Sequence, residues 1–131
     1  MELITGYWLV KEPIVLAIDR TSWRKYNLLV VSWIVYGRAI PINWQLLDKL
    51  GSSNLDEQQS VIHPITCLLP DYSFLLLGDR EFCSKQLATW LLKIGWGYYL
   101  RIEKSTCIHL DKQESITLNQ LVSCPGISVF I

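Results

Sequence analysis

The chain has 131 residues and a mass of 15.2 kDa, and 50% of its residues are hydrophobic while 18% are charged. This length suits one domain, and the apolar fraction excludes intrinsic disorder. The longest uncharged apolar run, residues 26–37, is shorter than the roughly 20 residues that a membrane-spanning helix needs. Because 12 basic residues balance 12 acidic ones, the chain lacks the basic excess of a dedicated nucleic-acid-binding domain.

The first half of the chain predicts three antiparallel strands. Residues 13–18 form an apolar run that predicts a buried strand ending before Asp19. After a polar connection, residues 27–36 are rich in β-branched and aromatic side chains and predict a second strand. A third strand is predicted at residues 39–44, and Pro41 places it at a sheet edge because proline lacks an N–H group for the ladder. Short connections between these strands predict a meander.

The second half predicts two helices that alternate with strands. Asn54 has the form of a helix N-cap, and Pro64 is expected to kink or split the helix that follows. Ser84 begins a second, amphipathic helix, and Gly95 ends it. The remaining predicted elements are strands at residues 73–78 and 98–102, followed by β structure from residue 106.

This order of elements, βββ-α-β-α-β, predicts an α/β fold with a mixed sheet. By analogy with ribonuclease-H-like folds, we expect the first strand to be central. The strand that ends before Asp79 is then expected to run parallel beside it.

Two aspartates, Asp19 and Asp79, directly follow apolar runs on the two strands that this fold makes neighbours. In open α/β sheets, ligand crevices lie at the carboxyl ends of the strands. Two adjacent carboxylates repel unless a cation bridges them, so they predict a Mg²⁺ or Mn²⁺ site suited to displacement at a phosphodiester. The alternative is that both residues only form turns, where aspartate is common.

Charge is uneven along the first half of the chain. The stretch from residue 20 to residue 47 contains no acid and four basic residues, which are Arg20, Arg24, Lys25 and Arg38. Such a strip suits a phosphate backbone, although a solvated surface is an equally simple interpretation. Trp23 lies within it and is a candidate for stacking on a flipped or frayed base, with a structural role as the alternative.

Three blocks of sequence surround these features: LAIDRTSWR at residues 16–24, YGRAIP at 36–41 followed by Trp44, and LLGDREF at 76–82. Together with residues 90–95 and 99–102, they resemble the blocks of bacterial DDE transposases, most closely the insertion-sequence-four type. The resemblance spans roughly residues 14–104.

The resemblance implies a Mg²⁺-dependent enzyme of DNA transposition and recombination. Such an enzyme cleaves DNA at transposon ends and joins the freed 3′ ends to a target. The resemblance assigns Asp19 and Asp79 as two catalytic, metal-binding carboxylates. Glu81 and Arg80 are candidates to support them, with a helix-start charge and an ordinary ion pair as alternatives. The candidate DNA contacts are Arg20, Trp23, Arg24, Lys25, Arg38 and Arg101.

The third carboxylate of that family is a glutamate within the pattern Y-x₂-R-x₃-E-x₆-K, located after a β-rich insertion. Tyr98 and Arg101 fit the first part of the pattern, but Ser105 stands at the glutamate position. The remaining acids downstream are Glu103, Asp111 and Glu114, which suit a solvated strand edge or turn.

We therefore expect a truncated transposase that is inactive alone. Its predicted domains are a partial ribonuclease-H-like core over residues 1–104 and the start of a β-rich insertion over residues 105–131.

Two alternatives belong to other functional classes. One is a small metal-dependent nuclease that recruits Glu81 or Glu103 as its third ligand. The other is a non-catalytic module that binds DNA or an intact transposase and interferes with it. The expected partners are transposon-end and target DNA, together with full-length transposase or a second copy of the chain. The expected location is the bacterial cytoplasm, at the nucleoid, and no membrane partner is expected.

Overall fold

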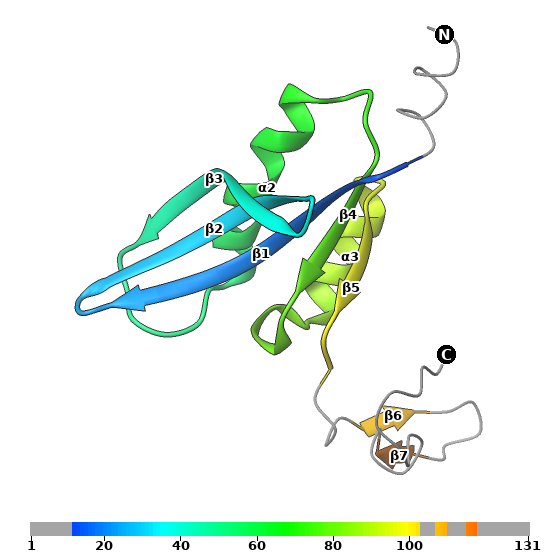
Figure 1. The fold of residues 1–131 in the computed structure, drawn as a ribbon. Coiled ribbons are helices and arrows are strands. Elements are labelled where there is room, and N and C mark those ends of the chain that lie inside the picture. The colour runs from blue at the N-terminus through cyan, green and yellow to red at the C-terminus, as the bar shows by residue number, and fades with distance from the viewer. Residues whose placement is uncertain (1–11, 103–106, 110–114, 118–131) are drawn as a thin grey trace, which may run out of the picture. The chain divides into compact units, whose positions relative to one another are not determined.

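A computed structural model of the chain describes residues 12–102, 107–109 and 115–117 (Figure 1). The chain divides into two compact units, Met1–Arg101 and Ile102–Ile131. In the first unit the elements are β1 (Ile14–Trp23), β2 (Tyr26–Val35), β3 (Arg38–Leu47), α2 (Leu55–Leu68), β4 (Phe74–Gly78), the 3₁₀ helix η1 (Arg80–Phe82), α3 (Lys85–Lys93) and β5 (Gly97–Leu100). In the second unit, β6 (Cys107–His109) pairs antiparallel with β7 (Ser115–Thr117). Whether this second unit begins a larger insertion stays a prediction.

The first unit contains a five-stranded mixed sheet with strand order β3-β2-β1-β4-β5. The meander β1-β2-β3 is antiparallel, while β4 runs parallel to both β1 and β5. The strand order confirms the predicted ribonuclease-H-like fold with a central first strand. Figure 1 shows α2 and α3 on the same face of this sheet.

The first strand is longer than its apolar run predicts. β1 does not end before Asp19 but continues to Trp23, and all the residues between them pair with β2. Arg24, in the left-handed conformation with φ 55°, belongs to a two-residue turn that joins the two strands. The predicted polar connection is therefore a hairpin, because ladder hydrogen bonds to β2 extend the strand beyond its apolar run, where most side chains are exposed.

Pro41 lies on the edge strand β3, as predicted. The register between β2 and β3 shifts beside it, since Val31 pairs with Asn43 while Ser32 pairs with Pro41. One extra residue on the edge strand makes a bulge there, which disturbs pairing only at the border of the sheet.

Both predicted helix starts are confirmed. Asn54 accepts a hydrogen bond from the Glu57 N–H, and the Glu57 side chain accepts one from the Asn54 N–H in return. Ser84 caps α3 by accepting a hydrogen bond from the Leu87 N–H. Pro64 does not split α2, which is one helix of 14 residues. The proline is exposed while its neighbours on the inner side of the helix are buried, so packing against the core supports the helix on both sides of it.

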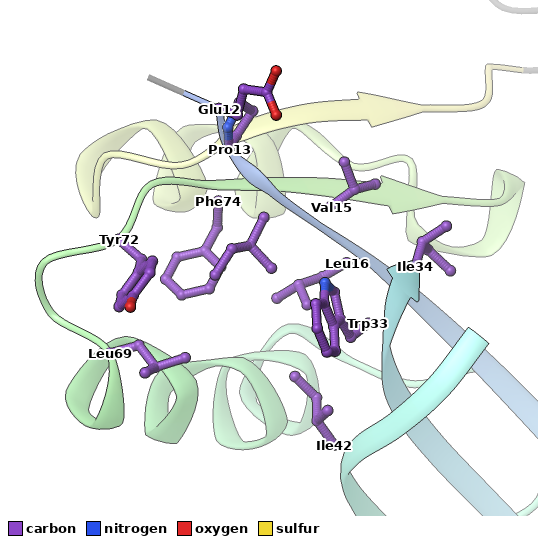
Figure 2. Close-up of a pocket in the computed structure, with 11 residues that line it drawn as sticks. Glu12, Pro13, Val15, Leu16, Trp33, Ile34, Ile42, Leu69, Tyr72 and Phe74 are labelled. Carbon is purple, nitrogen blue, oxygen red and sulfur yellow. The ribbon is translucent and has the colours of Figure 1, made fainter. Parts of the chain in front are cut away.

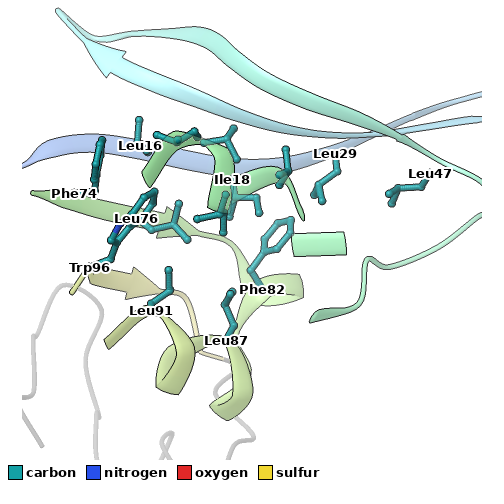
Figure 3. Close-up of a cluster of buried hydrophobic side chains, with 14 residues drawn as sticks. Leu16, Ile18, Leu29, Leu47, Phe74, Leu76, Phe82, Leu87, Leu91 and Trp96 are labelled. Atoms are coloured by element: carbon teal, nitrogen blue, oxygen red, sulfur yellow. The ribbon is translucent and has the colours of Figure 1, made fainter. Parts of the chain in front are cut away.

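One hydrophobic core joins both helices to the sheet (Figure 3). The inward-facing side chains of the central strands alternate with outward-facing ones, as a strand requires. The buried core residues are Leu16, Ile18, Leu29, Val31, Leu47, Val61, Ile62, Ile65, Phe74, Leu76, Phe82, Leu87, Leu91 and Trp96. No helix in the described part of the chain is long and apolar enough to cross a membrane.

Substitution of Leu76 tests the position of this core. Leu76 is 0% exposed, so Leu76→Ala should lower the free energy of unfolding by about 2–5 kcal/mol through lost burial and a residual cavity. Leu46→Ala removes the same atoms from a side chain that is 54% exposed, and should cost less than about 1 kcal/mol. Urea unfolding followed by circular dichroism measures both values, and equal losses would contradict this core.

Candidate functional site

Three neighbouring parallel strands carry one row of charged residues just beyond the point where the pairing between them ends. Ile18 pairs with Gly78, and Gly78 pairs with Leu100. The residues that follow these partners are Asp19, Asp79 and Arg101. Since neighbouring strands lie about 4.8 Å apart, the register places these three residues side by side across the sheet.

The row borders an open groove of about 510 Å³. Three consecutive residues from each strand line it, at positions 17–19, 77–79 and 99–101. Side chains alternate along a strand, and those of Leu16, Ile18 and Leu76 are buried in the core. Asp19 and Asp79 therefore point to the opposite face of the sheet, away from α2 and α3.

Each aspartate carboxylate is oriented by the backbone that follows it. The Arg20 N–H donates to Asp19 Oδ1 at 2.8 Å, and the Arg80 N–H donates to Asp79 Oδ1 at 2.7 Å. The main-chain N–H groups of even-numbered residues in β1 point toward β4, as the Ile14 N–H shows by donating to the Ser73 carbonyl. The ladder between β1 and β4 ends at Gly78, before it reaches Arg20. The Asp19 carboxylate thus accepts the hydrogen bond of the Arg20 N–H, for which the ladder provides no acceptor.

Arg101 lies beside the second aspartate. Its Nη1 atom is 3.8 Å from Asp79 Oδ1, and the two side chains are 71% and 62% exposed. An ion pair this exposed contributes little to stability. A cation or a phosphate group can therefore displace it at low cost.

The two carboxylates are suitable protein ligands for a magnesium ion. Mg²⁺ commonly takes one or two protein carboxylates and keeps several waters. Among the described residues, no group of three or more His, Cys, Asp or Glu side chains is placed to hold a metal ion. Cys83, directly after η1, does not line the groove, and burial raises the pKa of its thiol. The three downstream acids considered from the sequence lie outside the described residues.

Arg20 and Glu81 contact each other rather than the groove. Arg20 Nε lies 2.6 Å from Glu81 Oε1, and these side chains are only 21% and 17% exposed. Neither residue lines the groove. The geometry favours a structural role for both residues, rather than a DNA contact for Arg20 or a metal-ligand role for Glu81.

The predicted basic strip is not continuous in space. Arg24 and Lys25 form the turn between β1 and β2, whereas Arg38 begins β3 at the opposite end of the meander. Strands of ten residues at about 3.3 Å per residue separate these ends by roughly 30 Å.

The turn between β1 and β2 carries aromatic rings as well as charge. Trp23, 61% exposed, stacks on Tyr26 with ring centroids 6.2 Å apart. Arg24 lies 4.6 Å from the centroid of the Trp23 ring, and Lys25 lies 5.5 Å from that of Tyr26. We call these four residues the hairpin tip. Trp23 is four residues beyond Asp19, or about 13 Å along the strand.

Sequence reasoning assigned no role to one exposed aromatic residue near the aspartates. Trp44 is exposed on the edge strand, and it pairs with Val30, which pairs in turn with Asp19. It therefore lies two strands from Asp19 in the same row. Only the register of the sheet reveals this placement.

A larger cavity of about 630 Å³ lies at the other end of β1 (Figure 2). Figure 2 shows that apolar side chains surround it, among them Trp33, Ile42, Leu69 and Phe74. Sequence reasoning did not predict this cavity. It contains no pair of acidic or basic groups, so the groove at Asp19 is the better candidate for chemistry.

The fold is similar to two solved catalytic domains. The catalytic core domain of BIV integrase matches with a TM-score of 0.47 and 16% identity, over 70% of this chain and 56% of that one. The catalytic domain of Mos1 transposase, in a structure with Raltegravir and Mn, matches with a TM-score of 0.47 and 13% identity, over 74% of this chain and 55% of that one. The chain thus spans little more than half the length of either. No family model and no curated protein matches the sequence, and the insertion-sequence-four type stays a prediction.

Metal titration tests the groove directly. We expect weak binding of Mn²⁺, because two carboxylates supply only part of a coordination shell. Asp79→Asn should abolish it, since the amide carries no charge. Asp71→Asn removes a carboxylate outside the groove and should leave the affinity unchanged. Electron paramagnetic resonance of free Mn²⁺ measures all three proteins, and equal affinity in wild type and Asp79→Asn would exclude Asp79 as a ligand.

Proposed function

We propose that this chain is part of the catalytic core of a DDE transposase, which cuts and joins DNA strands. The observation that carries this proposal is the row of Asp19 and Asp79 on neighbouring parallel strands, facing an open groove. The sequence blocks around both residues support the insertion-sequence-four type, with transposon-end and target DNA as substrates.

Within this proposal, each residue of the groove has a distinct task. Asp19 and Asp79 would hold Mg²⁺ or Mn²⁺ through their carboxylates. Divalent metal there would supply the chemistry of phosphodiester displacement, which is activation of a water or a 3′-hydroxyl and stabilisation of the leaving oxygen. Arg101 offsets the charge of Asp79 and is positioned to contact a phosphate. Arg80 orients Asp79 through its backbone N–H.

The hairpin tip is the proposed DNA contact. Arg24 and Lys25 supply positive charge for phosphates, while the exposed rings of Trp23 and Tyr26 offer a surface for an unpaired base. The tip is about 13 Å from Asp19, a distance of about four base pairs along a duplex. Arg38 is a more remote candidate contact, because a duplex bound at the hairpin tip would need about ten base pairs to reach it.

The two alternative functions make different use of the same residues. A compact nuclease that recruits Glu81 is disfavoured, because Glu81 is bound to Arg20 and does not line the groove. A module that binds DNA without cutting it, and so interferes with an intact transposase, is favoured by the exposed hairpin tip. It requires no metal at Asp19 and Asp79.

Coupling between metal and DNA tests the proposed function. Fluorescence anisotropy with a short duplex that has a frayed end should show tighter binding when Mn²⁺ replaces an equal ionic strength of NaCl. The doubly substituted Asp19→Asn/Asp79→Asn protein should lose this enhancement but keep metal-free binding. Enhancement that persists in this variant would contradict the proposal and favour the interference module. Nicking of supercoiled DNA by the wild-type chain would favour the compact nuclease.

The same assay tests the hairpin tip. Arg24→Ala/Lys25→Ala should weaken binding and reduce the slope of log affinity against log salt by up to about two, because each phosphate contact contributes roughly 0.9. Lys85→Ala/Lys93→Ala removes the same charge from helix α3 and should leave the slope unchanged. Equal slopes in the two double variants would exclude the tip as the contact.

A further inference from the structure

The ion pair of Arg20 and Glu81 joins the two segments that carry the candidate carboxylates. Arg20 directly follows Asp19 in β1, and Glu81 lies two residues after Asp79, in η1. The two partners are 61 residues apart in sequence, and their contact at 2.6 Å is largely buried. It is therefore a direct side-chain connection between the two halves of the site.

A network of hydrogen bonds fixes the position of the Arg20 guanidinium. Its Nη1 atom donates to Ser22 Oγ at 2.7 Å and to Asn27 Oδ1 at 3.0 Å. Asn27 is fully buried, and its Nδ2 atom donates to the carbonyls of Lys49 and Gly51, each at 2.9 Å.

Glu81 is held on its other side as well. Its Oε2 atom accepts a hydrogen bond from Ser53 Oγ at 3.3 Å. A planar guanidinium with so many defined partners has little freedom to move, so it can set the distance between the segments it joins.

Such a connection is needed at this place in the sheet. The main-chain pairing between β1 and β4 ends at Ile18 and Gly78, one residue before the aspartates. Beyond that point, no ladder hydrogen bond between these two strands holds the carboxylates together, and two ionised carboxylates repel each other. Alternation along β1 places Arg20 on the core face, so its pairing with Glu81 leaves the groove face open.

We propose that Arg20 and Glu81 form a positioning pair, which holds Asp19 and Asp79 at the spacing that a bridging divalent cation requires. This inference rests on the proposed function of the two aspartates. It replaces the DNA contact predicted for Arg20 and gives Glu81 the supporting role for which the sequence made it a candidate.

Substitution of Arg20 separates positioning from simple charge. Arg20→Gln removes a positive charge near a cation site, so electrostatics alone predicts tighter Mn²⁺ binding. A positioning role predicts the opposite, a loss of about tenfold, as is common when the groups that orient metal ligands are removed. Lys49→Gln is the matched control, because Lys49 pairs with Glu57 at 3.0 Å and neither residue lines the groove. It should not weaken Mn²⁺ binding.

Three further variants complete the experiment, each measured by Mn²⁺ titration and by urea unfolding. Glu81→Gln should weaken binding to a similar extent, and the exchanged pair Arg20→Glu/Glu81→Arg should recover part of the affinity. Glu81→Asp keeps the charge but shortens the side chain, so it should also weaken binding. This variant tests the pair if Glu81→Gln does not fold.

The outcomes distinguish this proposal from the one on which it rests. If Asp79→Asn abolishes Mn²⁺ binding while Arg20→Gln and Glu81→Asp keep wild-type affinity, the pair has only a structural role and this inference is overturned. If wild type binds no Mn²⁺, or Asp79→Asn binds it equally well, the proposed metal site itself is wrong.

Discussion

The parallel pairing of β4 with β1 on one side and β5 on the other determines the whole candidate site. It brings Ile18, Gly78 and Leu100 into one row, so that the next residues along each strand also align. Gly78 suits this close packing. A Cβ atom there would lie 2.8 Å from Leu100 Cδ2, the end of a side chain that can turn away, and 3.1 Å from Phe82 Cβ, so η1 would have to shift by a few tenths of an ångström.

Strand alternation then gives neighbouring residues different tasks. Asp19 faces the groove, while Arg20 faces the core side and binds Glu81. The same division holds along β4 and the residue after it, since Leu76 is buried and Asp79 is exposed. One face of the sheet therefore provides stability, and the other carries charged and aromatic groups.

Sequence patterns predicted the order of elements, because apolar runs and helix caps are local signals. The central first strand and the alignment of Asp19 with Asp79 were instead expected by analogy with the ribonuclease-H-like fold. They did not predict that β1 continues to Trp23, since the extra pairing depends on β2 rather than on burial. The contact of Arg20 with Glu81 was also missed, because the two residues are 61 positions apart and sequence spacing does not specify such contacts. The position of Trp44 depends on the register of an edge strand, which no local pattern records.

The central claim is that Asp19 and Asp79 bind one divalent cation together. Anomalous X-ray scattering from crystals soaked in Mn²⁺ tests it most directly, because the metal is located by its own signal. The account predicts a peak in the groove within coordination distance of oxygen atoms from both aspartates. A peak bound by only one of them, or a groove without a peak while Mn²⁺ occupies another place, would contradict it.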